Sequence, residues 1–223
     1  MNINEAIEKF SSGNSLKKNE IKEVFLSIMK NECNDAEIIS FLMTLKTKGE
    51  TVEEISGAAE VLREMCVKLK LSSDQLVDTC GTGGDGQNTF NISTASAIVA
   101  AAAGVKIAKH GNKSISSKSG SADLLEYSGI NIDLDEEQSK KCFDNHGITF
   151  MFAPKYHKAM KNVANVRKNI KTRTIFNVLG PLSNPANAKF QVLGVYEKKL
   201  VLPIAEVIKE LGVKRALVVH SED

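Results

Sequence analysis

The chain has 223 residues, of which 42% are hydrophobic, and its 29 basic and 27 acidic side chains leave a formal net charge of +2. This near balance disfavours nucleic acids and membrane surfaces as partners, because both select clustered positive charge. The longest apolar run, residues 97–105, is too short to span a bilayer, and no signal segment opens the chain. Four cysteines without a C-x-x-C pair predict reduced thiols and a cytoplasmic protein.

Residues 1–72 are predicted to form a small helical domain, because apolar residues recur there at helical spacing. One helix is expected to begin after Asn34 and to end at Gly49. A capping box formed by Thr51 and Glu54 predicts the start of the next helix. We expect the apolar stripes to form the core of this domain and the interface of a homodimer.

Residues 73–223 are predicted to form a larger α/β domain with a mainly parallel sheet, because short apolar segments alternate there with helical patterns. The alanine-rich run 97–105 predicts a close-packed, buried helix between two of the strands. The expected strands are 76–80, 105–109, 148–152, 190–195 and 215–219.

The most informative segment follows the first of these strands. A loop is predicted there by four glycines, Gly81, Gly83, Gly84 and Gly86. The next helix is expected to begin at the capping residues 91–94. Glycines let backbone N–H groups approach an oxygen-rich ligand, and a helix N-terminus adds further donors and a partial positive charge. The order of strand, glycine loop and helix therefore predicts a phosphate-bearing ligand.

The same glycines also satisfy the G-x-G-x-x-G pattern of dinucleotide-binding proteins. That pattern requires a helix directly after the loop and an acidic residue about twenty positions further on, which holds the ribose. Here the helix is expected to begin near Ser93, and the next strand ends at Lys109 and His110. A dinucleotide site is therefore disfavoured, and the sequence of a P-loop is absent, while a plain glycine-rich turn remains an alternative.

A second polar loop follows the next predicted strand. Residues 109–126 hold three lysines, five serines and one asparagine, which are groups that donate hydrogen bonds to phosphates. Ser121 is predicted to be the N-cap of a short helix. Loops after consecutive parallel strands lie at the same edge of a sheet, so the two loops are expected to form one site, with a solvated polar loop as the alternative.

Four motifs, in this order along the chain, resemble the anthranilate phosphoribosyltransferase family. They are GTGGDG with TFNIST over 81–94, KHGN over 109–112, SGSAD over 119–123 and TRTIFNVLGPLSNP over 172–185. The resemblance implies a small helical domain and a larger α/β domain, of the nucleoside phosphorylase and phosphoribosyltransferase type. It also implies that a helical segment near residues 159–168 packs back onto the first domain.

The activity implied by the resemblance joins the amine of anthranilate to C1 of phosphoribosyl pyrophosphate and releases pyrophosphate, a step of tryptophan biosynthesis. Mg²⁺ is the implied cofactor, with Ser93 as a ligand, and no general base is assigned. The residues implied to hold phosphoribosyl pyrophosphate are Gly81, Gly84, Asp85, Thr89, Asn91, Ile92, Ser93, Thr94, Lys109, His110, Gly111, Asn112, Lys113, Ser114, Ser116, Ser117 and Ser121. Those implied to hold anthranilate are Gly81, His110, Asn112, His157 and Arg167.

Several of these residues have simpler explanations. Without the resemblance, Arg167 is an exposed surface arginine, Asp85 a turn residue and His157 an ordinary histidine at a helix start. The sequence also departs from the family pattern at Lys113, where arginine is usual, and at 156–158, where a second histidine and a proline are usual. A lysine at position 113 keeps the charge but lacks the planar pair of donors, and the departure at 156–158 falls on the implied anthranilate pocket.

The chain ends directly after the last predicted strand. Family members continue beyond this point and carry there an acidic pair that helps to bind Mg²⁺, so the resemblance implies a chain that is incomplete at its C-terminus and weakly active or inactive. A non-catalytic fragment of the enzyme remains an alternative. A related pyrimidine nucleoside phosphorylase, in which phosphate is the nucleophile, is the other.

Overall fold

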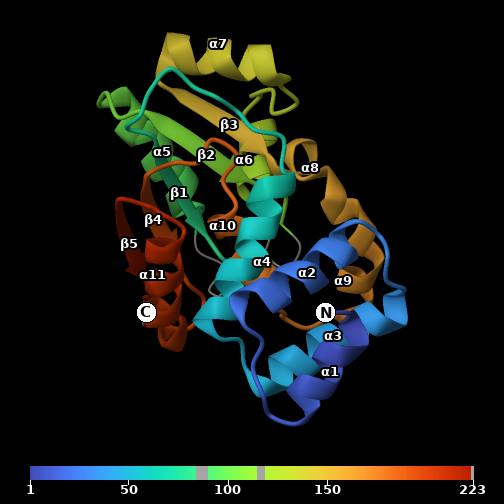
Figure 1. Ribbon diagram of the computed structural model, residues 1–223. Coiled ribbons are helices and arrows are strands. Elements are labelled where there is room, and N and C mark those ends of the chain that lie inside the picture. Colours follow the sequence, from blue (N-terminus) through green and yellow to red (C-terminus); the bar gives the residue numbers. More distant parts are fainter. Residues whose placement is uncertain (84–89, 115–118, 222–223) are drawn as a thin grey trace. The chain divides into compact units, whose positions relative to one another are not determined.

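The computed structural model describes residues 1–83, 90–114 and 119–221. The chain divides into two compact units, a helical unit of Met1–Cys66 with His157–Ser183 and an α/β unit of Val67–Tyr156 with Asn184–Asp223 (Figure 1). The predicted fold class, a helical domain plus a parallel α/β domain, is confirmed. The boundary lies at Cys66 instead of the expected residue 72, because the Val67 and Leu69 amides donate to carbonyls of the α/β unit.

The helical unit contains helices from two separate parts of the chain. They are α1 (Ile3–Ser11), α2 (Lys18–Met29), α3 (Asp35–Lys48), α4 (Val52–Met65), the 3-10 helix η1 (Lys158–Val163), α9 (Ala164–Ile170) and α10 (Phe176–Leu182). The predicted helix limits are found, since the Asn34 side chain caps α3, Gly49 ends it with a φ of 91°, and Thr51 and Glu54 form the capping box of α4.

The apolar stripes of the first helices form the core of this unit. Phe25 of α2 is fully buried, and its ring centroid lies 5.6 Å from that of Phe176 in α10. The Asn162 side chain donates to the Met29 carbonyl oxygen at 2.8 Å, which joins η1 to the end of α2. The segment 157–183, which includes the expected stretch 159–168, therefore completes the core built by the first 66 residues.

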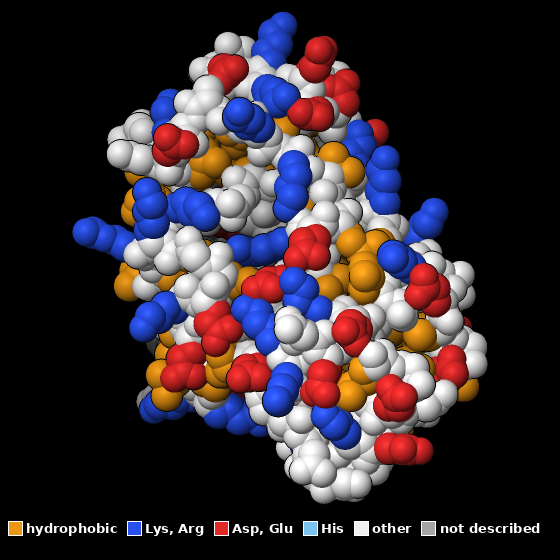
Figure 2. Space-filling view, in the orientation of Figure 1, with side chains coloured by type: hydrophobic (Ala, Val, Ile, Leu, Met, Phe, Trp, Pro, Cys, Tyr) orange, Lys and Arg blue, Asp and Glu red, His pale blue; other side chains and the backbone are white. Residues whose placement is uncertain are grey.

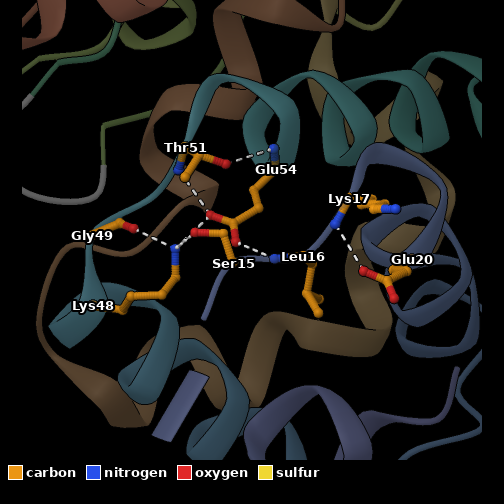
Figure 3. A network of polar contacts seen from close by, with 8 residues as sticks. All are labelled: Ser15, Leu16, Lys17, Glu20, Lys48, Gly49, Thr51 and Glu54. Atoms are coloured by element: carbon orange, nitrogen blue, oxygen red, sulfur yellow. Dashed lines mark hydrogen bonds and ion pairs between the residues drawn. The ribbon is translucent and has the colours of Figure 1, made fainter. Parts of the chain in front are cut away.

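A buried carboxylate joins three parts of the helical unit (Figure 3). The Glu54 side chain is 0% exposed and accepts hydrogen bonds from the Leu16 amide at 2.9 Å, the Thr51 amide at 2.8 Å and the Lys48 ammonium at 2.9 Å. A buried charge is tolerated only when it is paired and hydrogen-bonded, so all of these contacts are needed in the folded protein. They hold the α1–α2 loop, the end of α3 and the start of α4 together.

The α/β unit is built on a five-stranded parallel sheet with the strand order β3-β2-β1-β4-β5. The strands are β1 (Val77–Gly81), β2 (Ile107–Gly111), β3 (Ile148–Phe152), β4 (Phe190–Gly194) and β5 (Arg215–Val219), each within two residues of its predicted limits. The helices of this unit are α5 (Ile92–Ala102), α6 (Ser121–Tyr127), α7 (Glu136–His146), α8 (Ala153–Tyr156) and α11 (Val201–Glu210), with the 3-10 helix η2 (Lys198–Leu200) before α11.

The strand order creates a topological switch point at β1. From β1 the chain proceeds to β2 on one side, whereas β4 lies on the other side of β1 and leads outward to β5 (Figure 1). Ligands of open parallel sheets bind outside the carboxyl ends of the strands at such a point. The paired residues at these ends are Gly81 of β1 and Gly194 of β4.

The expectation of a buried helix over residues 97–105 is wrong. Within α5, all of whose residues are described, Thr94 and Ala97 are buried, but Ile98 is 46% and Val99 70% exposed. Small side chains let one face of α5 lie close to the sheet, and the opposite, apolar face remains open. Composition indicated an apolar helix correctly but could not show that one face alone is covered.

None of the helices formed by the described residues combines the length and the hydrophobicity of a membrane-spanning segment.

Candidate functional site

The first loop leaves the sheet at the switch point. The Thr82 amide donates to the Gly194 carbonyl oxygen at 2.9 Å, and the Thr82 hydroxyl accepts from the Tyr196 amide at 3.0 Å. Gly83 adopts a φ of 64°, a conformation that glycine reaches without strain. The start of the loop is thus fixed to β4. The predicted ligand residues Gly84, Asp85 and Thr89 lie outside the described residues.

The far end of this loop caps α5. The Asn91 side-chain oxygen accepts from the Thr94 amide at 3.3 Å and from the Thr94 hydroxyl at 2.8 Å. The Ser93 carbonyl oxygen accepts from the Thr79 hydroxyl of β1 at 2.8 Å. The helix begins at Ile92, one residue before the expected start, and its first turn is joined to β1. A helix start held beside a sheet edge presents N–H donors and positive charge to an anion.

Strand β2 contains a buried lysine, Lys109, two residues before its end. The Lys109 side chain is 3% exposed, and its ammonium donates to the Thr79 carbonyl oxygen. Asp78, 0% exposed, accepts from the His110 amide at 3.2 Å. Burial lowers the pKa of Lys109, which the charge of Asp78 opposes, and burial raises the pKa of Asp78, which the charge of Lys109 opposes. Each charge thus offsets part of the cost of burying the other, at the second residue of β1 and the third residue of β2.

The second loop is closed by α6. Ser121 is the first residue of α6 and not its N-cap as expected, because its hydroxyl donates to the Asn112 carbonyl oxygen at 3.3 Å and Gly120 occupies the cap position. Lys113 forms an ion pair of 2.8 Å with Glu126 of the same helix. Two further predicted residues of this loop, Ser116 and Ser117, lie outside the described residues. The described part places Gly111, Asn112, Lys113, Ser114 and Ser121 at the carboxyl end of β2.

The two remaining predicted residues belong to the helical unit. His157 is buried and directly precedes η1. Arg167 of α9 is half-buried, and its guanidinium lies over the Phe176 ring, 5.5 Å from the centroid. Burial lowers the pKa of Arg167, and no carboxylate among the described residues pairs with it. The exposed surface arginine of the simpler explanation is therefore disfavoured.

Three residues with evident structural roles were not predicted as site residues. Asp78 supports the start of the second loop, as described above. Asn184 is buried and donates to the Ala108 carbonyl oxygen of β2 at 2.9 Å. Asp123 accepts from two backbone amides of the second loop. Asp78 could have been recognised as an acidic residue inside the predicted strand 76–80. Asn184 and Asp123 lie inside the motifs 172–185 and 119–123, but neither was assigned to the site.

The described residues contain no group of three or more His, Cys, Asp or Glu side chains arranged to hold a metal ion. Mg²⁺ in phosphate-transferring sites commonly has few protein ligands and several water and phosphate ligands. The Ser93 hydroxyl lies at the start of α5 and donates to the Asn91 side-chain oxygen at 3.4 Å. Its oxygen atom could serve as a metal ligand. Among the described residues, the Ser93 hydroxyl therefore fits a metal ion that binds together with phosphates.

The surface agrees with the balanced charge of the sequence. On the face shown in Figure 2, lysine and arginine side chains are scattered among acidic ones. They do not form a continuous basic stripe on that face.

Two family models match the chain, the α/β domain of a glycosyl transferase family over residues 73–223 and its helical bundle domain over residues 4–66. The chain belongs to this glycosyl transferase family. The two matches correspond to the α/β unit and to the first part of the helical unit.

Several proteins with similar sequences and structures carry the same name. The anthranilate phosphoribosyltransferase of Clostridium kluyveri is 53% identical over 221 residues, 99% of this chain and 66% of the relative. The crystal structure of the Thermus thermophilus enzyme of that name has a TM-score of 0.92 at 42% identity and covers 97% of this chain and 66% of its own. The resemblance predicted from the motifs is confirmed.

A second similar structure contains ligands. The anthranilate phosphoribosyltransferase of Saccharomyces cerevisiae, in complex with phosphoribosyl pyrophosphate and Mg, has a TM-score of 0.91 at 30% identity, over 99% of this chain and 66% of that one. The present chain thus spans about two thirds of the length of the relatives that it matches.

Proposed function

We propose that the protein acts as an anthranilate phosphoribosyltransferase, which transfers the phosphoribosyl group from phosphoribosyl pyrophosphate to the amine of anthranilate. The products are N-(5-phosphoribosyl)anthranilate and pyrophosphate. The observation that carries the proposal is that a glycine loop and a serine- and lysine-rich loop follow β1 and β2, two adjacent parallel strands, and so leave the sheet at the same edge. The names and ligands of the similar proteins support it.

The chemistry requires stabilisation of the leaving group. As the bond to pyrophosphate breaks, the ribose ring gains positive charge and the pyrophosphate gains negative charge, so donors fixed in advance around the phosphates lower the barrier. The start of α5, with Ser93 and Thr94, and the buried Lys109 are the groups proposed for this role. The other proposed contacts to phosphoribosyl pyrophosphate remain those implied by the motifs.

Mg²⁺ is the proposed cofactor, and when bound it would neutralise charge on adjacent phosphate oxygens. The Ser93 hydroxyl is the group of the described residues proposed to hold it.

Arg167 is proposed to bind the anthranilate carboxylate. A guanidinium matches a carboxylate with two parallel hydrogen bonds, and a half-buried one without an acidic partner is costly unless a ligand supplies the anion. The Phe176 ring lies 5.5 Å from the guanidinium carbon and contacts it by a cation–π interaction. Gly81, His110, Asn112 and His157 stay proposed contacts to anthranilate. An aromatic amine is unprotonated at neutral pH, so the chain needs no strong general base.

A homodimer through the helical unit stays a prediction. Among the described residues of that unit, Met43 is the large apolar side chain that is exposed, whereas the α/β unit exposes several. Sedimentation at several protein concentrations would detect such a dimer.

The test follows anthranilate fluorescence after addition of phosphoribosyl pyrophosphate and Mg²⁺. We expect the fluorescence to fall as anthranilate is consumed, and only when all three components are present. Phosphate-dependent cleavage of a pyrimidine nucleoside without loss of anthranilate would instead indicate a nucleoside phosphorylase. A folded protein with neither reaction would indicate a non-catalytic member of the family.

A further inference from the structure

The side chain of Asp123 contacts both ends of the second loop. Its Oδ2 atom accepts a hydrogen bond from the Ser114 amide at 2.8 Å and another from the Gly120 amide at 2.7 Å. These two residues flank the stretch 115–118, which lies outside the described residues. One carboxylate oxygen thus holds together two backbone positions that are six residues apart in sequence.

The packing around these bonds is too close for most other residues. A Cβ atom at position 120 would lie 2.5 Å from the Ser114 nitrogen and 2.7 Å from the Asn112 carbonyl oxygen. That carbonyl oxygen also accepts from the Ala122 amide at 3.2 Å. Backbone atoms cannot move apart without breaking these bonds, so glycine at position 120 and the acid at position 123 act together to close the loop.

The electrostatics show that Asp123 is charged in its contacts. The hydrogen bonds from the Ser114 and Gly120 amides lower the pKa of Asp123, and the positive charge of Lys113 lowers it further. Hydrogen bonds to an ionised acceptor are stronger than neutral ones. Lys113 is itself paired with Glu126, so the carboxylate at position 123 depends mainly on the two amides.

We infer that Asp123 is a positioning residue, which fastens the two ends of the phosphate-binding loop before the ligand arrives. The ligand, phosphoribosyl pyrophosphate, rests on the proposed function. A carboxylate near phosphates would repel them, and here its oxygen is turned to the loop backbone. Loop ends that are already fixed lose less conformational entropy when the ligand binds, so the hydrogen bonds to Asp123 favour tight binding through Asn112, Lys113 and Ser121.

The test compares Asp123→Ala with Asp123→Asn and with a matched control, Asp135→Ala. Asp135 is also an acid at a helix start of the α/β unit, and it accepts from the Gln138 amide at 2.8 Å, but it caps α7. We expect Asp123→Ala to weaken the binding of Mg²⁺–phosphoribosyl pyrophosphate, measured by titration calorimetry, by about tenfold or more. The asparagine oxygen can accept the same two bonds, so Asp123→Asn should recover part of this loss, while Asp135→Ala should bind as the wild type does.

A measurement without ligand makes the inference independent of the reaction. In ¹H–¹⁵N spectra, the Ser114 and Gly120 amide protons of Asp123→Ala should move upfield together and exchange faster with solvent, while the Gln138 amide stays unchanged. Unmoved amides in a folded Asp123→Ala variant, or unchanged ligand affinity, would overturn the inference. If both amides respond but the wild type does not bind phosphoribosyl pyrophosphate, the role of Asp123 in fixing the loop ends is supported. The proposed function is then overturned.

Discussion

At the scale of single residues, the guanidinium of Arg167 is the group whose surroundings demand an anion. It is half-buried over Phe176 and has no carboxylate partner among the described residues. We expect Arg167→Ala to raise the KM for anthranilate by an amount equivalent to about 2 kcal/mol or more, and Arg167→Lys to recover little, because an ammonium lacks the planar pair of donors. Steady-state kinetics with each substrate varied in turn would measure this.

The KM for phosphoribosyl pyrophosphate should change little in both Arg167 variants. Lys168→Ala is the matched control, since Lys168 is the exposed neighbour on the same helix. An equal loss for both substrates would remove Arg167 from the anthranilate site.

The buried Glu54 carboxylate is the centre of a network of polar contacts in the helical unit. Glu54→Ala would remove the acceptor of the Leu16 and Thr51 amides and the carboxylate that pairs with Lys48, so we expect the free energy of unfolding to fall by about 3 kcal/mol in urea titrations. Glu20→Ala is the control, because Glu20 makes similar bonds to the Lys17 amide at 2.8 Å and to Lys9 at 2.7 Å in a half-exposed position (Figure 3). Its loss should be about 1 kcal/mol. Equal losses would show that burial of Glu54 has no special effect.

At the scale of helices and strands, α4 packs against α2 through Gly57. A Cβ atom there would lie 2.5 Å from Cγ2 of Ile21 and 2.8 Å from the Lys18 carbonyl oxygen. Alanine favours a helix over glycine by about 1 kcal/mol, but the Lys18 backbone cannot move aside cheaply. We therefore expect Gly57→Ala to lower the melting temperature of the protein.

Gly180→Ala supplies the opposite case. Position 180 lies within α10, and a Cβ atom there meets nothing within 4 Å. The same change should therefore lower the melting temperature less than Gly57→Ala does, with Pro181 as the neighbour that opposes a Cβ atom at position 180. A Gly57→Ala variant that is as stable as Gly180→Ala would contradict the close α2–α4 packing.

The elements that the sequence predicted best are those with local signals. The capping box at Thr51 and the glycine after α3 depend on neighbours within a few residues, and the five strands are short apolar runs between polar loops. The exposure of Val99 and the cap of α6 were predicted wrongly, because they depend on which distant surface lies opposite.

The candidate site shows the same division. The glycine loop and the lysine- and serine-rich loop were recognisable from residue types, and their common edge followed from the parallel strand order. The supporting carboxylates were not, because Asp78 meets the His110 amide 32 residues away and Asp123 acts through backbone atoms that have no signature in the sequence. The ligand contacts of all the site residues remain predictions, and Asp85, Thr89 and Ser117 also lie outside the described residues.

At the scale of the whole molecule, the helical unit is discontinuous in sequence. Residues 157–183 supply Phe176 against Phe25 and Asn162 against the end of α2. We expect a 1–66 fragment to melt less cooperatively than a version in which 157–183 is attached through a flexible linker. The free energy of unfolding of the 1–66 fragment should be lower by about 2 kcal/mol or more, because the fragment lacks the buried contact between Phe25 and Phe176. Identical melting curves by circular dichroism would show that the first 66 residues fold independently.

The central claim is that phosphoribosyl pyrophosphate binds at the carboxyl edge of β1 and β2. The most direct measurement is a ¹H–¹⁵N titration of the protein with phosphoribosyl pyrophosphate and Mg²⁺, with the amides of both units followed together. We expect saturable shifts at residues 81–83, 91–94 and 109–114, which end β1, begin α5 and end β2, and little change at residues 16–54 of the helical unit. Saturable shifts confined to the helical unit, or a folded protein whose β1 and β2 ends do not respond to the ligand, would contradict this placement of the site.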